Sequence, residues 1–267
     1  MQQVNFEWEF IIADDYSTDG TREILQEYKN KYPDLIQLIL QPSNVGASKN
    51  WLQLLGAANN KYIAYMEGDD YWIDPLKLQK QVDFLEANPE FIITYHDAKI
   101  IDSSGSTLFE NMLAERNKKD FSSLELKKGP HILTLSIMYR NVIKEFPPEI
   151  SMVFNGDTFL FSLLGNYGIG KYLSNIENAA YRKHNTGVWT SVTKENRMLH
   201  FVNTYLNLVA FYKRNDDYEI QYYFNKKISG FYKMLVLFYF KKLRFIESFS
   251  YGIKLIKILI HIRKKHK

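Results

Sequence analysis

Two adjacent carboxylates, Asp69 and Asp70, follow an apolar run at residues 62–66 that has the composition of a buried strand. Adjacent carboxylates repel each other unless a cation neutralises them, and their hard oxygen atoms suit Mg²⁺ or Mn²⁺. A metal held in this way has few protein ligands and completes its shell with substrate phosphates and water. The pair therefore predicts metal-assisted chemistry on a phosphate-bearing substrate. The alternative is an Asp-Asp turn that caps the next helix.

Two further polar segments follow earlier apolar runs. Asp14 and Asp15 begin the segment DDYSTDGT directly after residues 8–13, and the segment NVGASKN follows the apolar run at residues 36–40. The carboxyl ends of parallel strands meet at one edge of an α/β sheet, which is where such sheets bind ligands. We therefore expect all three polar segments to border one crevice.

Hydrophobic patterning and turn residues predict alternating strands and helices over the first hundred residues. Four strands are expected, at residues 8–13, 36–40, 62–66 and 91–95. Helices are expected at about 18–32, at about 47–58 and after Pro75, with Ser17, Thr18 or Asp19 capping the first of them. This alternation indicates an α/β sandwich built on a mostly parallel sheet.

The pattern changes after Asp102. A strand is predicted over residues 132–139, a short helix over 157–164 and extended chain over 169–181. From about residue 191 the chain is expected to be helical to its end. The predicted boundary near residue 190 separates an α/β body from a helical extension.

The polar segments together resemble the successive signatures of family 2 glycosyltransferases, which are inverting nucleotide-sugar enzymes with the GT-A fold. The matching stretches are DDYSTDGT, NVGASKNW and YIAYMEGDDYW, the last followed by DP and KLQKQ, and the resemblance covers residues 5–190. It implies a GT-A domain at residues 1–190, with a Rossmann-like, mostly parallel sheet sandwiched by helices, and a helical extension at residues 191–267.

The resemblance also implies an activity. A sugar would pass from a nucleotide-sugar donor, with a UDP-sugar favoured, to a hydroxyl of a glycan or lipid-linked glycan during surface polysaccharide or lipopolysaccharide biosynthesis. Mn²⁺ or Mg²⁺ would stabilise the charge that builds on the leaving diphosphate. Matching positions assign Asp70 as the main metal ligand and Asp69 to the sugar-nucleotide. Asp15 would hydrogen-bond the nucleotide base, and the loop with Asn44, Gly46 and Asn50 would border base and ribose.

An inverting transfer needs a base that accepts the proton of the acceptor hydroxyl. The family takes this base from a carboxylate at the start of a later helix, and the segment FNGDTFL matches that pattern with Asp157. An N-cap role for Asp157 is the alternative. The segment YRKHNTGVW resembles the family's closing segment over the diphosphate, so Arg182 would offset phosphate charge and His184 would complete the metal shell or contact the diphosphate.

One feature of the family is absent from this sequence. The family begins with a strand and a helix that carry a Thr/Ser-Tyr-Asn-type motif, whereas this chain resembles the family from the end of that helix onwards. We therefore expect a sheet that lacks its central strand. Two alternatives to the transferase stay open. One is a sugar-phosphate nucleotidyltransferase, which shares the layered α/β design and the metal chemistry. The other is a truncated remnant that binds a nucleotide or a membrane without turnover.

Charge is distributed unevenly along the chain. Residues 241–267 contain nine Lys or Arg and one acidic residue, Glu247, whereas the rest carries 25 basic and 29 acidic residues. This balance argues against a nucleic-acid partner and favours an anionic surface as the partner of the tail. Basic residues at 254, 257, 261, 264 and 265 interrupt a run of Ile and Leu, which suits a helix lying on an anionic leaflet. A helix packed on the body with a solvated lysine face is the alternative.

Cysteine is absent, which excludes disulfides and thiolate metal sites. The first ten residues lack the basic region and apolar run of a secretory signal. The apolar run at residues 234–240 is far shorter than the roughly 20 residues of a bilayer span. The sequence therefore predicts a cytoplasmic protein that is peripheral on the inner face of the cytoplasmic membrane.

Overall fold

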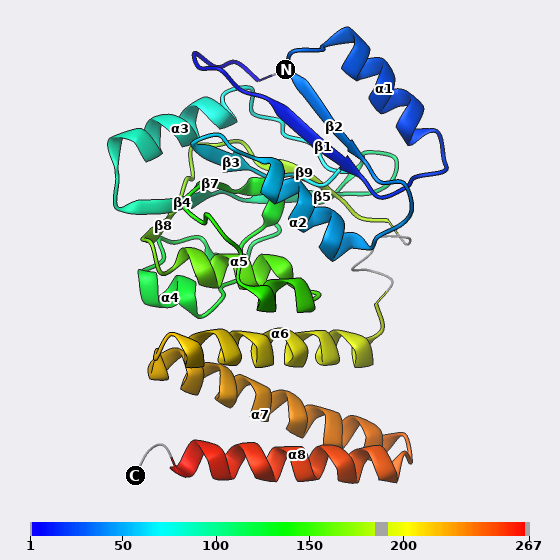
Figure 1. Cartoon of the computed structure of the whole chain (residues 1–267), viewed down its shortest axis with the longest axis vertical. Helices are drawn as coiled ribbons and strands as arrows, with labels where there is room; N and C mark the ends of the chain where they lie inside the picture. Colours follow the sequence, from blue (N-terminus) through cyan, green and yellow to red (C-terminus); the bar gives the residue numbers. More distant parts are fainter. Residues whose placement is uncertain (1, 185–191, 265–267) are drawn as a thin grey trace.

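Strands and helices alternate through the first hundred residues of the computed structural model, which describes residues 2–184 and 192–264 (Figure 1). In chain order they are β1 (Phe10–Asp14), α1 (Thr21–Lys31), β2 (Ile36–Leu40), α2 (Ala47–Ala57), β3 (Tyr62–Ala64), α3 (Lys77–Ala87) and β4 (Phe91–Tyr95). The predicted order of elements is confirmed, and the bounds of β2 and β4 are those expected. The cap of α1 differs, because Gly20 with φ 91° precedes the helix and Asp19 bonds to Thr21 instead.

The second half of the body is built from shorter elements. They are β5 (Ala98–Ile101), β6 (Thr107–Phe109), η1 (Glu115–Asn117), α4 (Ser123–Lys127), η2 (Thr134–Ser136), β7 (Met138–Arg140), η3 (Pro148–Met152), α5 (Gly156–Leu164), β8 (Ile169–Tyr172) and β9 (Ala179–Arg182). The strand expected over residues 132–139 therefore begins only at Met138. The chain makes a 3₁₀ turn first, because the N–H and the hydroxyl of Ser136 both donate to the carbonyl of Leu133, at 3.0 and 2.7 Å.

The strands form three sheets in the part of the chain that the structure describes. Their orders are β1-β2, β3-β7-β4-β8 and β6-β5-β9. The pairs β1–β2, β4–β8 and β5–β9 are parallel, as expected for an α/β fold. Pairing is antiparallel where β7 lies between β3 and β4, and where β6 borders β5. The sheet is thus less uniformly parallel than the sequence predicted.

The β1–β2 pair forms a sheet of its own. Over the described residues no strand ladder joins the β1–β2 pair to β3. Most of β1 is only half-buried, and α1 contains no buried residue. The side chains of Val4, Phe6 and Trp8 pack instead beside α3 and β7 in a small cluster around Leu85. This part of the body consequently has much less buried apolar surface than the β4–α5 region.

Three long helices are stacked one below another beneath the body (Figure 1). They are α6 (Lys194–Arg214), α7 (Tyr218–Lys241) and α8 (Phe245–Lys264). Helix α6 packs against α5 and η3, α7 against α6, and α8 against α7. Leu208 and Tyr212 of α6 and Phe224 of α7 belong to the main core, so these helices close the underside of the body. The predicted boundary near residue 190 lies outside the described residues.

Candidate active site

The first aspartate-rich loop is bound directly to the glycine loop that follows β2. Asp15, which comes just after β1, accepts hydrogen bonds from the backbone N–H groups of Val45 (2.7 Å) and Gly46 (3.0 Å). Gly46 has φ 88° and ψ 148°, a backbone conformation that is essentially confined to glycine. Two of the three segments expected to border one crevice are therefore in contact.

Asn44 has its partner within its own loop, whereas Asn50, in the first turns of α2, bonds to residues outside that loop. Asn44 Oδ1 accepts from the N–H of Gly46 at 3.2 Å, and Asn50 Nδ2 donates to the carbonyl of Ala13 at 3.2 Å. Asn50 Oδ1 accepts from Gln41 Nε2 at 3.1 Å. The two Asn50 bonds fasten the start of α2 to the end of β1 and to Gln41, which follows β2.

A short bridge holds the acidic pair against β9. Tyr71 and Ala180 exchange backbone hydrogen bonds of 3.2 and 2.9 Å. This register brings the backbone N–H of Arg182 within 2.8 Å of Asp70 Oδ1. Asp70 is buried and Asp69 is exposed, so two carboxylates that look alike in the sequence have different surroundings.

Asp69 contacts His184. Its Oδ2 lies 2.7 Å from His184 Nε2, and both side chains are partly open to solvent. The guanidinium of Arg182 crosses the same loop, where Nε donates to the carbonyl of Asp69 at 3.1 Å and Nη1 reaches two carbonyls of the loop after β5 at 3.3 Å. Arg182 and His184 thus converge on the acidic pair, but His184 bonds to Asp69 and not to Asp70.

A third carboxylate, Glu67, lies in the same loop as Asp69 and Asp70, and we call residues 67–70 the acidic loop. Burial and the neighbouring carboxylates disfavour the ionised form of Glu67. Burial raises the pKa of Asp70 to about 6 against the opposing hydrogen bond from Arg182, and the charge of Asp69 adds to the rise. Burial likewise raises the pKa of Glu67 to about 7, although the hydroxyl of Thr134 donates to its Oε1 at 2.7 Å. Glu67 Oε2 and Asp70 Oδ2 are buried without a hydrogen-bond partner. Two such oxygens on one loop favour the approach of a cation or a donor.

Tyr65 connects this loop electrostatically with Asp157. Burial raises the pKa of the Tyr65 hydroxyl, and the charges of Glu67, Asp157 and Asp69 raise it further. The charges of the predicted base Asp157 and of the acidic loop thus act on the same buried hydroxyl.

Asp157 is the second residue of α5, because the helix begins at Gly156 and Asn155 stands at the N-cap. The predicted N-cap alternative for Asp157 is therefore wrong. Its Oδ1 accepts a 2.7 Å bond from the N–H of Thr158, and the positive end of the helix dipole favours its charge. Burial nevertheless raises its pKa, opposed by the Thr158 bond and by His131. A carboxylate with a raised pKa is a better proton acceptor than an ordinary one.

Two contacts join the start of α5 and the residues before it to helix α2. The Ser48 hydroxyl donates to the carbonyl of Val153 at 3.2 Å. The indole of Trp51 lies against Gly156, so closely that a Cβ at Gly156 would be 2.6 Å from the ring atom Cζ3. The position of Asp157 is thus set by a residue of the segment NVGASKNW.

A divalent metal would need oxygen ligands from its substrate at this site. No cluster of three or more metal-ligating side chains occurs within residues 2–184 and 192–264. The unpartnered Oδ2 of Asp70 and Oε2 of Glu67 are hard oxygen atoms of the kind that Mn²⁺ and Mg²⁺ prefer. The residues present therefore fit a metal that binds together with a diphosphate.

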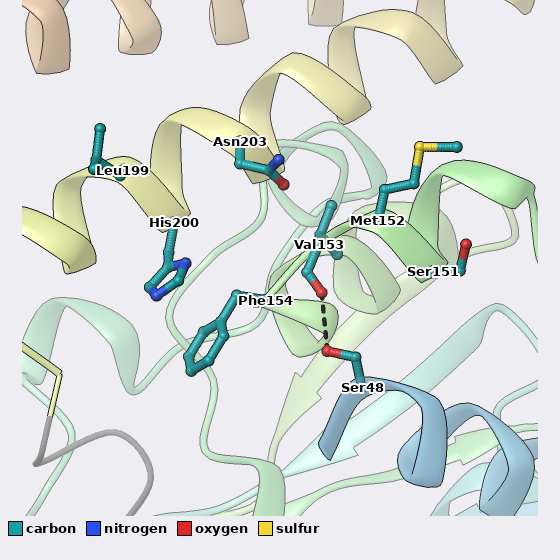
Figure 2. A pocket seen from close by; sticks show the side chains of 8 residues that line it. All are labelled: Ser48, Ser151, Met152, Val153, Phe154, Leu199, His200 and Asn203. Carbon is teal, nitrogen blue, oxygen red and sulfur yellow. Dashed lines mark hydrogen bonds between the residues drawn. The ribbon is translucent and has the colours of Figure 1, made fainter. Parts of the chain in front are cut away.

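An open pocket of about 470 Å³ lies between α2, η3 and α6, beside the loop that leads to Asp157 (Figure 2). It is lined by Ser48, Ser151, Met152, Val153, Phe154, Leu199, His200 and Asn203. The rings of Phe154 and His200 are stacked with centroids 4.0 Å apart. Apolar faces and polar groups are thus combined in one open pocket, whose lining includes Phe154, three residues before Asp157.

Sequence reasoning did not assign roles to several of these residues. A role for Glu67 could have been predicted from the sequence, since it stands two residues before Asp69 on the same loop. Thr134 and Tyr65 carry no comparable signal, because a threonine or tyrosine is recognisable as a site residue only from what surrounds it. The packing of Trp51 on Gly156 likewise depends on two segments that are far apart in sequence.

Comparison with known proteins supports the sequence resemblance. The family model described as Glycosyl transferase family 2 matches residues 2–146. An uncharacterized protein of Mycobacterium tuberculosis is 35% identical over 201 residues, which are 73% of this chain and 56% of that protein. This chain thus spans little more than half the length of that relative. Bacillus subtilis TuaG, whose name assigns it to teichuronic acid biosynthesis, is 40% identical over 85 residues, or 32% of this chain and 33% of TuaG.

A solved structure supports the fold. The crystal structure of S. aureus TarS 1–349 in complex with UDP-GlcNAc is similar with a TM-score of 0.58 and 15% sequence identity. The similarity covers 95% of this chain and 85% of that chain, so it includes helices below the α/β body. The predicted GT-A-type α/β fold with a helical C-terminal region is confirmed.

Proposed function

This chain belongs to glycosyl transferase family 2, and we propose that it transfers a sugar from a nucleotide-sugar donor to a hydroxyl of a surface glycan, with inversion at the anomeric carbon. The observation that carries the proposal is the acidic loop, in which Asp70 Oδ2 and Glu67 Oε2 are buried without a hydrogen-bond partner, together with Asp157 in the first turn of α5. A base for the acceptor and an acidic loop for the diphosphate are the two halves that such a transfer needs.

The proton of the acceptor hydroxyl would pass to the Asp157 carboxylate. The acceptor oxygen then forms a bond to the anomeric carbon while the bond from that carbon to the diphosphate oxygen breaks. The products are the lengthened glycan, a nucleoside diphosphate and a protonated Asp157. The pKa of Asp157 is raised by burial, which suits a carboxylate that has to take up this proton.

The acidic loop and β9 would hold the diphosphate. We assign Asp70 as the main protein ligand of Mn²⁺ or Mg²⁺, because its Oδ2 is buried and has no hydrogen-bond partner. The bound metal would neutralise charge on the leaving diphosphate. Asp69 would contact the sugar-nucleotide, with His184 orienting it across the 2.7 Å contact. Arg182 would contribute positive charge beside the phosphates.

The nucleotide would lie at the loop formed by Asp15, Asn44, Gly46 and Asn50. The Asp15 carboxylate is already fixed by two backbone N–H groups, which supports a preformed edge for base recognition. UDP is the favoured nucleotide. TarS, which has a similar fold, was crystallised with UDP-GlcNAc, which agrees with this choice.

The pocket between α2, η3 and α6 would receive the acceptor. Its Phe154–His200 stack offers an aromatic face, and Ser48 and Asn203 offer hydrogen-bonding groups, which is the combination that sugars use. Replacing Phe154 with Ala is expected to lower the rate of transfer while leaving nucleotide binding unchanged. A weakened nucleotide shift in this variant would place the pocket on the donor side instead.

Nucleotide binding can be tested on the full chain by thermal unfolding with UDP, GDP and dTDP, each with and without Mn²⁺. A shift that needs Mn²⁺, selects one nucleotide and disappears in Asp70→Asn would support the donor site. One-site binding at a hundredfold excess over Kd contributes about 2.7 kcal/mol, which is readily measured. Absence of any shift for every nucleotide would contradict the proposal.

Turnover is tested by incubating the nucleotide-sugar with Mn²⁺, with water in the place of the acceptor hydroxyl, and analysing the products for free sugar and nucleoside diphosphate. Release of a nucleoside diphosphate that is lost in Asp157→Asn supports the transferase. Release of pyrophosphate from a sugar phosphate and a nucleoside triphosphate would instead identify a nucleotidyltransferase. Nucleotide binding without either product would identify a non-catalytic binding protein.

A further inference from the structure

Helix α8 carries two apolar stripes on opposite faces. The inner stripe includes Tyr251, Leu255 and Ile258, which pack against α7. The outer stripe consists of Ile246, Phe249, Ile253, Ile256 and Ile260, with exposed fractions of 86, 72, 40, 59 and 49%. Within each stripe the spacing is three or four residues, so its members share one face of the helix. Members of different stripes, such as Phe249 and Tyr251, are two positions apart, which corresponds to about 200° of rotation and places them on opposite faces. A helix that packs on only one side has no structural need for the outer stripe.

The orientation of α8 is fixed by contacts on its inner side. The ring of Tyr251 stacks on Tyr239 of α7 with centroids 5.5 Å apart. The hydroxyl of Ser248 donates to the carbonyl of Val236 at 3.0 Å. Arg244, in the turn before α8, forms ion pairs with Glu195 at the start of α6. The outer stripe therefore faces away from the protein, on the outermost of the three stacked helices (Figure 1).

The apolar surface continues around the turn between α7 and α8. Leu243 is 75% exposed, and the exposed rings of Phe240 and Phe245 contact each other with centroids 5.7 Å apart. Scattered apolar side chains are normal on protein surfaces, but a continuous set of this kind marks an interaction surface. We call the outer stripe together with these three residues the α8 surface.

Positive charge borders the α8 surface. Lys254 and Lys257 each follow a member of the outer stripe by one position, and both are exposed. Residues 241–267 hold nine Lys or Arg and a single acidic residue, Glu247. Glu247 is already paired with Arg244 at 2.7 Å, which leaves the surroundings of the stripe strongly basic. A second copy of this chain would bring the same positive charge and be repelled, whereas an anionic bilayer would be attracted.

We infer that the α8 surface binds an anionic membrane, with α8 lying in the plane of the interface. Apolar side chains of the outer stripe would enter the boundary between headgroups and acyl chains, and the flanking lysines would contact anionic headgroups. None of the helices that the structure describes is both long and apolar enough for a span, so the contact is interfacial. Such binding does not depend on the transferase reaction, and its failure would leave that proposal intact.

The inference is tested by cosedimentation of the full chain with vesicles of phosphatidylcholine containing about 30 mol% phosphatidylglycerol, compared with vesicles of phosphatidylcholine alone. The wild-type chain should bind the anionic vesicles and lose binding as salt screens the charges. The double variant Ile246→Ser, Phe249→Ser should bind at least about tenfold more weakly, because two large side chains no longer enter the interface. The pair Lys254→Gln, Lys257→Gln should weaken binding by about fivefold for each charge removed.

A matched control tests whether the place of the two side chains matters, because it removes the same residue types, one Ile and one Phe, from elsewhere on the surface. Ile24 and Phe109 are also exposed, by 56 and 61%, but lie on α1 and β6. The double variant Ile24→Ser, Phe109→Ser should bind vesicles like the wild type. Because the changed side chains are exposed, all variants should melt like the wild type. Thermal melts that show this exclude unfolding as the cause of lost binding.

Three results would overturn the inference. The first is a wild-type chain that remains in the supernatant with anionic vesicles. The second is equal loss of binding in the α1–β6 control and the α8 variant. The third is a dimer in sedimentation velocity that Ile246→Ser, Phe249→Ser abolishes in the absence of lipid, which would assign the α8 surface to a second copy.

Discussion

The contact between Trp51 and Gly156 is expected to control the position of Asp157, the proposed base. A Cβ at residue 156 would lie 2.6, 3.0 and 3.1 Å from three atoms of the indole ring, which is too close for any of them to stay in place. Trp51 is packed against the main core and cannot swing away freely. Overpacking of this kind costs about 1–3 kcal/mol, so Gly156→Ala should lower the free energy of unfolding by that amount.

The same variant should impair activity more than its stability loss suggests. Asp157 directly follows the altered residue, and a displacement of about 1 Å at a reacting group can cost on the order of a hundredfold in rate. Urea denaturation measures the first effect, and nucleoside diphosphate release at saturating donor, well below the melting temperature, measures the second. We expect a fall in kcat with an intact nucleotide-induced thermal shift.

Gly56→Ala is the matched control, because Gly56 lies in the same helix as Trp51 and a Cβ there meets no atom within 4 Å. This change should stabilise the protein by about 0.5–1 kcal/mol through helix propensity. Adding Trp51→Leu to Gly156→Ala should recover part of the lost stability, since the smaller side chain makes room for the new methyl group. Wild-type stability and activity in Gly156→Ala would refute the proposed positioning of Asp157.

Three further variants test separate features. Asp157→Asn should be inactive. The wild type should lose stability as pH rises through the raised pKa of Asp157, because ionisation of this buried carboxyl opposes folding, and the variant should not show this loss. Urea midpoints measured between acidic and neutral pH give the difference. Burial holds the pKa of Lys77 well below its usual value of 10.5, so the wild type should lose stability as pH falls from that value, and Lys77→Met should flatten this dependence in thermal melts. Ser122→Ala removes a complete capping box with Glu125 and should cost about 1 kcal/mol in urea denaturation.

Elements with a local sequence signature were predictable. Strands β2 and β4 were expected with the bounds that they have, because short β-branched and aromatic runs between turn residues leave few alternatives. The segment before β7 was predicted wrongly, since residues 132–139 are mostly apolar and alternate with Thr134 and Ser136 as a strand would. Its 3₁₀ turn depends on the hydrogen bonds of Ser136 to Leu133, which apolar patterning does not reveal.

The candidate site was predictable as a set of residues but not as a set of contacts. Asp69 and Asp70 are indistinguishable in sequence, yet one is exposed beside His184 and the other is buried beneath Arg182. Those contacts cross 112 and 115 positions of sequence, and they depend on the register of one bridge between Tyr71 and β9. Register of this kind is decided by the packing of the whole sheet.

The sequence by itself determined which chemical groups are available, in what order they follow the strands, and that the C-terminal segment is basic and apolar at helical spacing. These are local properties, because residue type, strand and helix periodicity and charge are written into neighbouring positions. Only the tertiary structure decided that Glu67 joins the acidic loop without a partner for one oxygen, and that Trp51 sets the start of α5. It also decided that α8 buries one apolar stripe and exposes the other. Each of these three features depends on how segments that are distant in sequence pack together. Burial sets pKa values and exposed surfaces, and a side chain is buried only after those segments have packed.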